Sequence, residues 1–288
     1  MIVKREHESG QISVSIIKDS VSEYGDRITT FELEYPRFIH SELMTHRMFS
    51  RNAMSSRAVP IEKMINQVRE NPAMPIHWGK NQGGMQADRE LSNRQKEVVI
   101  KRWIDAADSA CDIAESMSAE NAHKQVVNRI LEPYQRMKTI ITATEYCNFF
   151  GLRCHKDAQP EIKALAELMR DCMEESVVDK LKAGEWHIPY VESGEDGLFV
   201  MEGDLTYPLS LEDALKVSAS CCAQVSYRLL DNSVSKAIMI YDKLVESKPV
   251  HASPFEHQAK VMRKWEFDRR YPDLEEGVTP VSYTHLRA

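Results

Sequence analysis

Long hydrophobic runs are absent from this chain of 288 residues, so no segment is long enough to cross a membrane as a helix. The first residues also carry no signal-peptide core. No two of the six cysteines have C-x-x-C spacing, and Cys154-His155 has no partner set at metal-ligand spacing. We therefore expect a cytoplasmic protein with free thiols and without a metal site.

An excess of positive charge is missing as well. The formal net charge is -7, which argues against a nucleic-acid polymer or a membrane surface as a general partner. A local basic site can still hold a single phosphate. No serine or cysteine stands in a recognisable nucleophile elbow, and no Ser-His-Asp order stands out. We therefore expect residues that bind and orient ligands rather than a nucleophile.

Apolar residues alternate at 11–18 and again at 28–35, which predicts two paired strands joined across residues 23–26. Periodicity predicts helices at about 61–69, 88–120, 122–131, 157–181, 210–227 and 233–247. In the longest helix we expect seven residues to be buried, namely Val98, Ile100, Trp103, Ile104, Ala107, Ala110 and Ile113. Residues 184–208 predict a loop with one short strand at 198–200. The expected fold is α/β (α+β), with a small mixed sheet flanked by several long helices.

We expect one domain over residues 1–278. The ending 279–288 has no pattern that fits this fold and resembles a translated adapter sequence, so we interpret it as a non-native tail. The loop at 71–85 is rich in proline and glycine, and either a lid or a surface excursion fits that composition.

A polar cluster follows the second predicted strand. We expect a helix from about Phe38 onward, which places His46, Arg47 and Arg51 within one and a half turns. Four further polar residues stand at its end: Ser50, Asn52, Ser55 and Arg57. Hydroxyls, an amide and a guanidinium together can bind an anion. A solvated basic helix before a loop is the alternative interpretation.

The spacing of this cluster resembles R-H-R-x-x-S-x-N-E-x-S-x-R, the signature of the flavin-dependent thymidylate synthases. Six of the eight defined positions match, namely His46, Arg47, Ser50, Asn52, Ser55 and Arg57. Two positions depart from the signature. Thr45 replaces the first arginine, and Ala53 replaces a glutamate that contacts the nucleotide in this family.

Other segments resemble the same family. Residues 128–133 resemble its A-R-x-x-L-P segment with Arg129 as the arginine, and 148–153 resemble N-F-x-x-L-R with Asn148 and Arg153. The family's motifs A-R-V-S and H-x-[ST]-P-F-E-H, which begin its sequences, appear here near the end, at 222–227 and 251–257. The chain therefore looks like a circularly permuted, phage-type member of the family.

The resemblance implies an FAD-dependent reductive methylation of dUMP to dTMP that uses methylenetetrahydrofolate and NADPH, in a homotetramer and without an enzymic nucleophile. It assigns the dUMP site to Glu42, Ser55, Ser56, Arg57, Arg129 and Arg153. It assigns the FAD site to His46, Arg47, Asn52, Asn148, Ser226, His251 and Ser253. Glu42 stands where the family has glutamine, and we hypothesise that its carboxylate replaces the one lost at Ala53. That hypothesis fails if Glu42→Gln leaves dUMP affinity and turnover unchanged.

Three alternatives stay open. The altered pocket at Ala53 and Glu42 also fits another one-carbon transfer, such as hydroxymethylation of dUMP. A flavin- or nucleotide-binding homologue without turnover, or a structural protein without a ligand, would keep the same fold. Arg129 and Arg153 can equally be surface ion-pair partners, and His46 a packed histidine.

Overall fold

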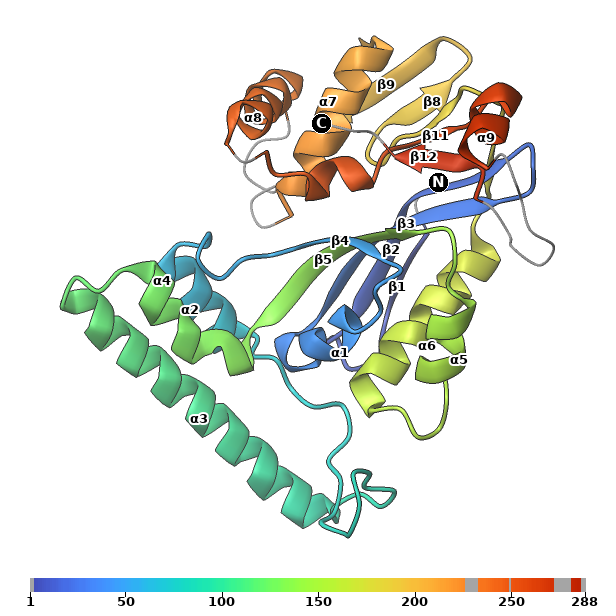
Figure 1. Ribbon diagram of the computed structural model, residues 1–288. Helices are drawn as coiled ribbons and strands as arrows, with labels where there is room; N and C mark the ends of the chain where they lie inside the picture. Colours follow the sequence, from blue (N-terminus) through green and yellow to red (C-terminus); the bar gives the residue numbers. More distant parts are fainter. Residues whose placement is uncertain (1–2, 226–232, 249, 272–280, 286–288) are drawn as a thin grey trace.

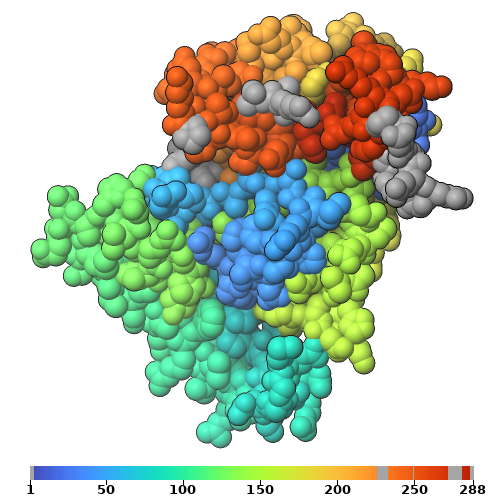
Figure 2. Space-filling model, viewed as in Figure 1, coloured from blue at the N-terminus to red at the C-terminus, as the bar shows by residue number. Residues whose placement is uncertain are grey.

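The computed structural model describes residues 3–225, 233–248, 250–271 and 281–285. Figure 1 shows two stacked parts, a lower one built from the first 180 residues and an upper one built mainly from the rest. The space-filling view shows the orange and red C-terminal residues as a layer over the blue and green part (Figure 2). The lower part carries the signature residues at 46–57.

A mostly antiparallel sheet of six strands forms the lower part, in the order β1-β2-β3-β5-β4, with β6 paired in parallel to β2. The strands are β1 (Lys4–Glu6), β2 (Ser13–Ser22), β3 (Arg27–Pro36), β4 (Ser50–Ala53), β5 (Arg136–Ala143) and β6 (Asp179–Leu181). The predicted pairing of residues 11–18 with 28–35 is confirmed by β2 and β3. Gly25 allows their tight turn, because its φ of +96° is strained for a residue with a Cβ.

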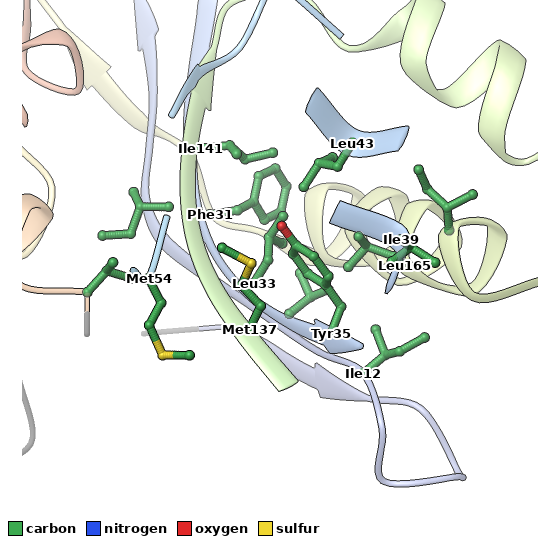
Figure 3. Close-up of a cluster of buried hydrophobic side chains, with 14 of the residues drawn as sticks. Ile12, Phe31, Leu33, Tyr35, Ile39, Leu43, Met54, Met137, Ile141 and Leu165 are labelled. Carbon is green, nitrogen blue, oxygen red and sulfur yellow. The ribbon is translucent and has the colours of Figure 1, made fainter. Parts of the chain in front are cut away.

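One face of this sheet carries the main hydrophobic core (Figure 3). Phe31, Leu33 and Tyr35 alternate along β3 toward this face, as the period of a strand requires. Leu165 from helix α6 (Pro160–Glu175) covers them. The mixed fold of strands and helices expected from the sequence is confirmed.

The remaining helices of the lower part are α1 (His40–Met44), α2 (Ile61–Glu70), α3 (Asn93–Ala119), α4 (Lys124–Val127) and α5 (Cys147–Arg153), with 3-10 turns η1 (Arg37–Ile39) and η2 (Asn128–Tyr134). The continuous helix expected at 122–131 is wrong, because only four residues of it are α-helical. The chain continues as a 3-10 helix through Pro133, whose missing N–H cannot support an α-helical bond. The helix expected at 157–181 is shorter, since β6 begins at Asp179.

Helix α3 extends away from the body along one edge of the molecule (Figure 1). The burial expected along it is wrong at three positions, since Val98, Ile104 and Ile113 are 55%, 40% and 55% exposed. The burial expected at Ala107 is confirmed, and the buried residues of the helix are small, namely Ala107, Cys111 and Ala114. These small residues let the helix lie close to α2 and η2, whereas Val98 and Ile113 stay exposed.

The upper part contains two small antiparallel sheets, β10-β9-β8 and β12-β11-β7. Its elements are β7 (Trp186–His187), β8 (Glu192–Gly194), β9 (Gly197–Glu202), β10 (Leu205–Leu209), α7 (Leu211–Ala223), α8 (Val234–Glu246), η3 (Ser253–Glu256), β11 (Ala259–Val261), α9 (Lys264–Arg270) and β12 (Tyr283–His285). The strand expected at 198–200 is confirmed by β9, whereas the rest of 184–208, expected as a loop, also contains β7, β8 and most of β10. Its two hairpins turn at 195–196 and 203–204, and residues such as Gly203, with φ of +61°, favour such turns.

The last described residues have a place in this part. Strand β12 pairs with β11, and the Ser282 and Ser22 hydroxyls lie 2.8 Å apart. The interpretation of 279–288 as non-native concerns its origin and stays a prediction, as does the single domain at 1–278. Within 279–288, however, residues 283–285 do form a strand.

Candidate functional site

The signature does not form one helix, so this expectation is wrong. Helix α1 ends at Met44, and Ser50–Ala53 form β4, whose Ser50 lies opposite Thr142 of β5. Arg51 Nη1 donates to the carbonyls of Met44 and His46 at 3.0 and 3.3 Å, which satisfies carbonyls at the end of the helix. Glu42 and Ala53 consequently lie on different elements rather than on successive turns of one helix.

Arg153, the last residue of α5, joins the residues before β4. Its Nε donates to His46 Nε2 at 2.9 Å, its Nη1 to Glu42 Oε2 at 3.3 Å and its Nη2 to Thr45 Oγ1 at 3.3 Å. The structure thus brings together three of the predicted site residues, namely Glu42, His46 and Arg153. The guanidinium fork fixes their relative positions, because each of its nitrogens has a separate partner.

His46 is held as a neutral ring. Its Nε2 accepts from Arg153, so its proton lies on Nδ1. Burial and the charge of Arg153 both lower the pKa of His46. The ring also packs edge-on against Phe149, with 4.8 Å between the ring centroids. The packed-histidine interpretation and the site interpretation therefore both fit this residue.

Two hollows meet at Arg153. The smaller, of about 210 Å³, is lined by residues 45–49 together with Asn148, Phe149 and Arg153. It includes the exposed side chain of Arg47, and its wall offers an amide, two guanidinium groups and the carboxylate of Glu145 to a polar ligand. This combination fits the polar edge of a large cofactor.

The larger hollow, of about 1080 Å³, lies between α1, α6 and the loop at 75–88. Glu42 and Arg153 form part of its wall, with Phe38 and Trp103 as aromatic surfaces. Hydrogen bonds hold this loop at its beginning, from Ile76 N to the buried Glu161 carboxylate at 2.8 Å, and across its ends, between His77 Nε2 and Ala87 O at 2.7 Å. The loop is therefore a fixed wall of the hollow in this structure.

A second cluster surrounds the carboxylate of Glu132. Its Oε1 accepts from Ser56 Oγ at 2.7 Å and from Arg129 Nη1 at 2.9 Å, and it forms an ion pair with Arg37 Nη2 at 3.1 Å. Ser56 and Arg129 are thus brought together, as predicted, but by an anion of this chain. Sequence reasoning missed Arg37 and Glu132, although Glu132 lies within the 128–133 segment that carries the resemblance.

A third contact joins residues two hundred positions apart. The amide nitrogen of Asn52, on β4, donates to Ser253 O at 3.2 Å and to Arg51 O at 3.0 Å, since the opposite amide orientation would face its oxygen toward acceptors. Ser253 begins η3, so the residues at 251–257 pack directly on the signature strand. Two of the predicted flavin residues therefore lie side by side.

The other predicted residues divide as follows. Arg57 is exposed in the turn after β4, beside the half-buried Ser55, and His251 is exposed before η3. Ser226 lies outside the described residues. Within the described ranges, no three His, Cys, Asp or Glu side chains are placed to hold a metal ion. No helix in the same ranges is long and apolar enough to cross a membrane.

Comparisons with known proteins bear on the lower part. The sequence model of a family described as thymidylate synthase complementing protein matches residues 20–177, more than half of the chain. A flavin-dependent thymidylate synthase of Aquifex aeolicus (strain VF5) is 25% identical over 153 residues, which are 52% of this chain and 47% of that protein. The chain thus spans about half the length of this curated relative.

Two solved structures of one protein are similar to part of this chain. A UMP/dUMP methylase, PolB from Streptomyces cacaoi, bound with 5-Br UMP, has 17% identity and a TM-score of 0.49, covering 59% of this chain and 90% of PolB. The same protein bound with 5-Br dUMP has 17% identity and a TM-score of 0.48, covering 59% and 91%.

Proposed function

Because the chain belongs to the family of thymidylate synthase complementing proteins, we propose that it is a flavin-dependent methyltransferase that converts dUMP to dTMP. The observation that carries this proposal is the Arg153 cluster. It joins α5 to His46 of the signature and places one guanidinium between two hollows. The name of the Aquifex relative, a flavin-dependent thymidylate synthase, supports the same activity.

In this proposal the dUMP phosphate binds to Arg153 and to Arg57, with Ser55 beside them. Guanidinium groups suit phosphate because their donors form a rigid fork. Arg129 and Ser56 belong to the nucleotide side as well, where Glu132 holds them in place before the nucleotide binds. Glu42 takes part through Arg153, whose guanidinium it holds.

We assign FAD to the neighbouring polar surface. Arg47 and Asn148 line the smaller hollow beside His46, and Asn52 is bonded to Ser253, with His251 two residues earlier. We also assign Ser226 to this side, from the resemblance alone. When bound, FAD would supply the hydride, while the residues of this chain position it and exclude water. NADPH and methylenetetrahydrofolate complete the proposed reaction as co-substrates.

The permuted order is part of the proposal. The contact of Asn52 with Ser253 supports it, because the segment 251–257 reaches the signature strand from the far end of the chain. We also propose the homotetramer that the resemblance implies, and the exposed apolar side chains of Val98 and Ile113 on α3 are candidates for its subunit contact.

An absorbance spectrum of the purified protein, followed by titration with dUMP, tests the proposal. We expect flavin bands that shift when dUMP is added, and mass analysis should then identify dTMP as the product. The shift should be lost in Arg153→Gln and kept in Arg170→Gln, which changes a surface arginine paired with Asp171 on α6.

Other results would contradict the proposal in different ways. A colourless protein that takes up no added FAD would refute the flavin assignment. Hydroxymethyl-dUMP as product would favour the alternative one-carbon transfer. A yellow protein that makes neither product would favour a non-catalytic homologue.

A further inference from the structure

A continuous chain of hydrogen bonds crosses the sheet on the face opposite the main core. It runs through Ser20, His187, Thr30, Thr142, His257 and Asn52, in that order. The five successive separations are 2.9, 2.8, 2.7, 2.8 and 3.3 Å. The first five side chains are at most 1% exposed. Buried polar groups are normally paired, but a chain of this length couples all of its members.

The register of the sheet and the upper part build this chain together. Thr30 of β3 lies directly opposite Thr142 of β5, so their hydroxyls meet on one face. His187 comes from β7 and His257 from the residue after η3, and each imidazole covers one threonine. The sheet residues come from the family-matched region, whereas both histidines lie outside it.

The chain has a direction, because both imidazoles are neutral. Burial lowers the pKa of His257 to about 3 and lowers that of His187 well below its ordinary value. A neutral imidazole has one donor and one acceptor nitrogen, and a hydroxyl has one proton. If one end of the chain donates, every bond along it must run the same way.

Asn52 sets that direction. One terminal atom of its amide lies against Arg51 O, Ser253 O and His257 Nε2, and nitrogen is the atom that suits these acceptors. With the amide nitrogen there, His257 Nε2 carries no proton and its Nδ1 donates to Thr142. The Thr142 hydroxyl then donates to Thr30, and the Thr30 hydroxyl donates to His187 Nε2. His187 therefore carries its proton on Nδ1 and donates it to Ser20.

We propose that this chain is a positioning device for the Asn52 amide, in which the two histidines and two threonines hold one amide orientation against Ser253. His257 and Thr142 are then positioning residues for the edge of β4, and they act through Asn52. The benefit to flavin binding rests on the proposed function, whereas the direction of the chain does not.

The imidazole nitrogen resonances of 15N-labelled protein test the direction, because they distinguish a protonated from an unprotonated ring nitrogen. In the wild type, both His187 and His257 should carry the proton on Nδ1. Asn52→Ala should change the resonances of His187 as well as those of His257, although three other side chains of the hydrogen-bond chain lie between Asn52 and His187. In a Thr142→Val background, Asn52→Ala should no longer affect His187, and Thr142→Ser should restore the effect.

Thr139→Val is the matched control. Thr139 is a buried threonine on the same strand, but its hydroxyl is bonded to Tyr35 OH at 2.8 Å and takes no part in the chain. This variant should leave the resonances of both histidines unchanged. The proposal is overturned if either histidine carries its proton on Nε2, or if Asn52→Ala leaves His187 unchanged in a protein with wild-type circular dichroism.

FAD titration tests the positioning role. Thr142→Val should weaken FAD binding by about tenfold, the effect of losing one well-placed hydrogen bond. Thr142→Ser and Thr139→Val should stay within about twofold of the wild type. Equal FAD affinity in Thr142→Val and the wild type would overturn the positioning role. If neither the wild type nor any variant binds FAD, the proposed function fails. The imidazole resonances alone then decide whether Asn52 sets the direction of the hydrogen-bond chain.

Discussion

Replacing Glu42 by glutamine tests how the proposed nucleotide site controls its main cation. Glu42 Oε2 lies 3.3 Å from Arg153 Nη1, and the two side chains are 34% and 21% exposed. Ion pairs with this exposure typically contribute 0.2–1 kcal/mol, that is up to about 1 kcal/mol after solvent screening. The upper end applies here, because His46 and Thr45 already fix the guanidinium.

A phosphate that binds Arg153 must share it with this carboxylate. Removing the negative charge should therefore strengthen dUMP binding by about fivefold, the factor that corresponds to about 1 kcal/mol. Deoxyuridine has no phosphate, so its affinity should not change. Isothermal titration with both ligands measures the two effects.

Glu167→Gln is the control for this experiment. Glu167 lies on the wall of the same larger hollow and is paired with Lys163 rather than with Arg153, so it removes an equal charge without touching the cluster. It should leave both affinities unchanged. Weaker binding of dUMP and deoxyuridine by the same factor in Glu42→Gln would refute the reasoning. That result would instead support the hypothesis that Glu42 replaces the carboxylate missing at Ala53.

Three further predictions concern stability and assembly. Asp19→Ala should lower the free energy of unfolding in urea by about 3–5 kcal/mol. The buried carboxylate of Asp19 accepts from Arg27 and Thr29, and both would lose this partner. A loss below about 1 kcal/mol would contradict this prediction. Acid should destabilise the protein between about pH 6.5 and 4, by up to about 1.4 kcal/mol per pH unit for each buried histidine. The unfolded histidines bind protons near pH 6.5, whereas burial lowers the pKa in the folded protein to about 4 for His40 and about 3 for His257. His40→Gln should therefore make the pH dependence of stability shallower. An unchanged slope would argue against a role of His40 in this pH dependence. Val98→Glu combined with Ile113→Glu should reduce the sedimenting mass while barely changing the folding of one chain, and an unchanged mass would show that these two residues do not lie in a subunit contact.

Short-range patterns predicted several elements well. The alternation at 11–18 and 28–35 predicted the β2–β3 pair, because the apolar residues of each strand alternate toward the main core. The helices expected at 61–69 and 233–247 are close to α2 and α8 for the same kind of reason. Where the pattern depended on a distant partner, as at Val98 of α3, the expected burial was wrong.

The sequence by itself determined the family, because the signature at 46–57 is a local arrangement of residue types that survives without coordinates. Only the tertiary structure decided that Ser50–Ala53 is a strand, since β4 exists by pairing with β5 some ninety residues later. It also decided that Glu132 is hydrogen-bonded to Arg129 and Ser56. The same is true of the hydrogen bonds that join His187 to Thr30 and His257 to Thr142. These contacts depend on which distant segments the fold brings to the same place, and no local periodicity records that information.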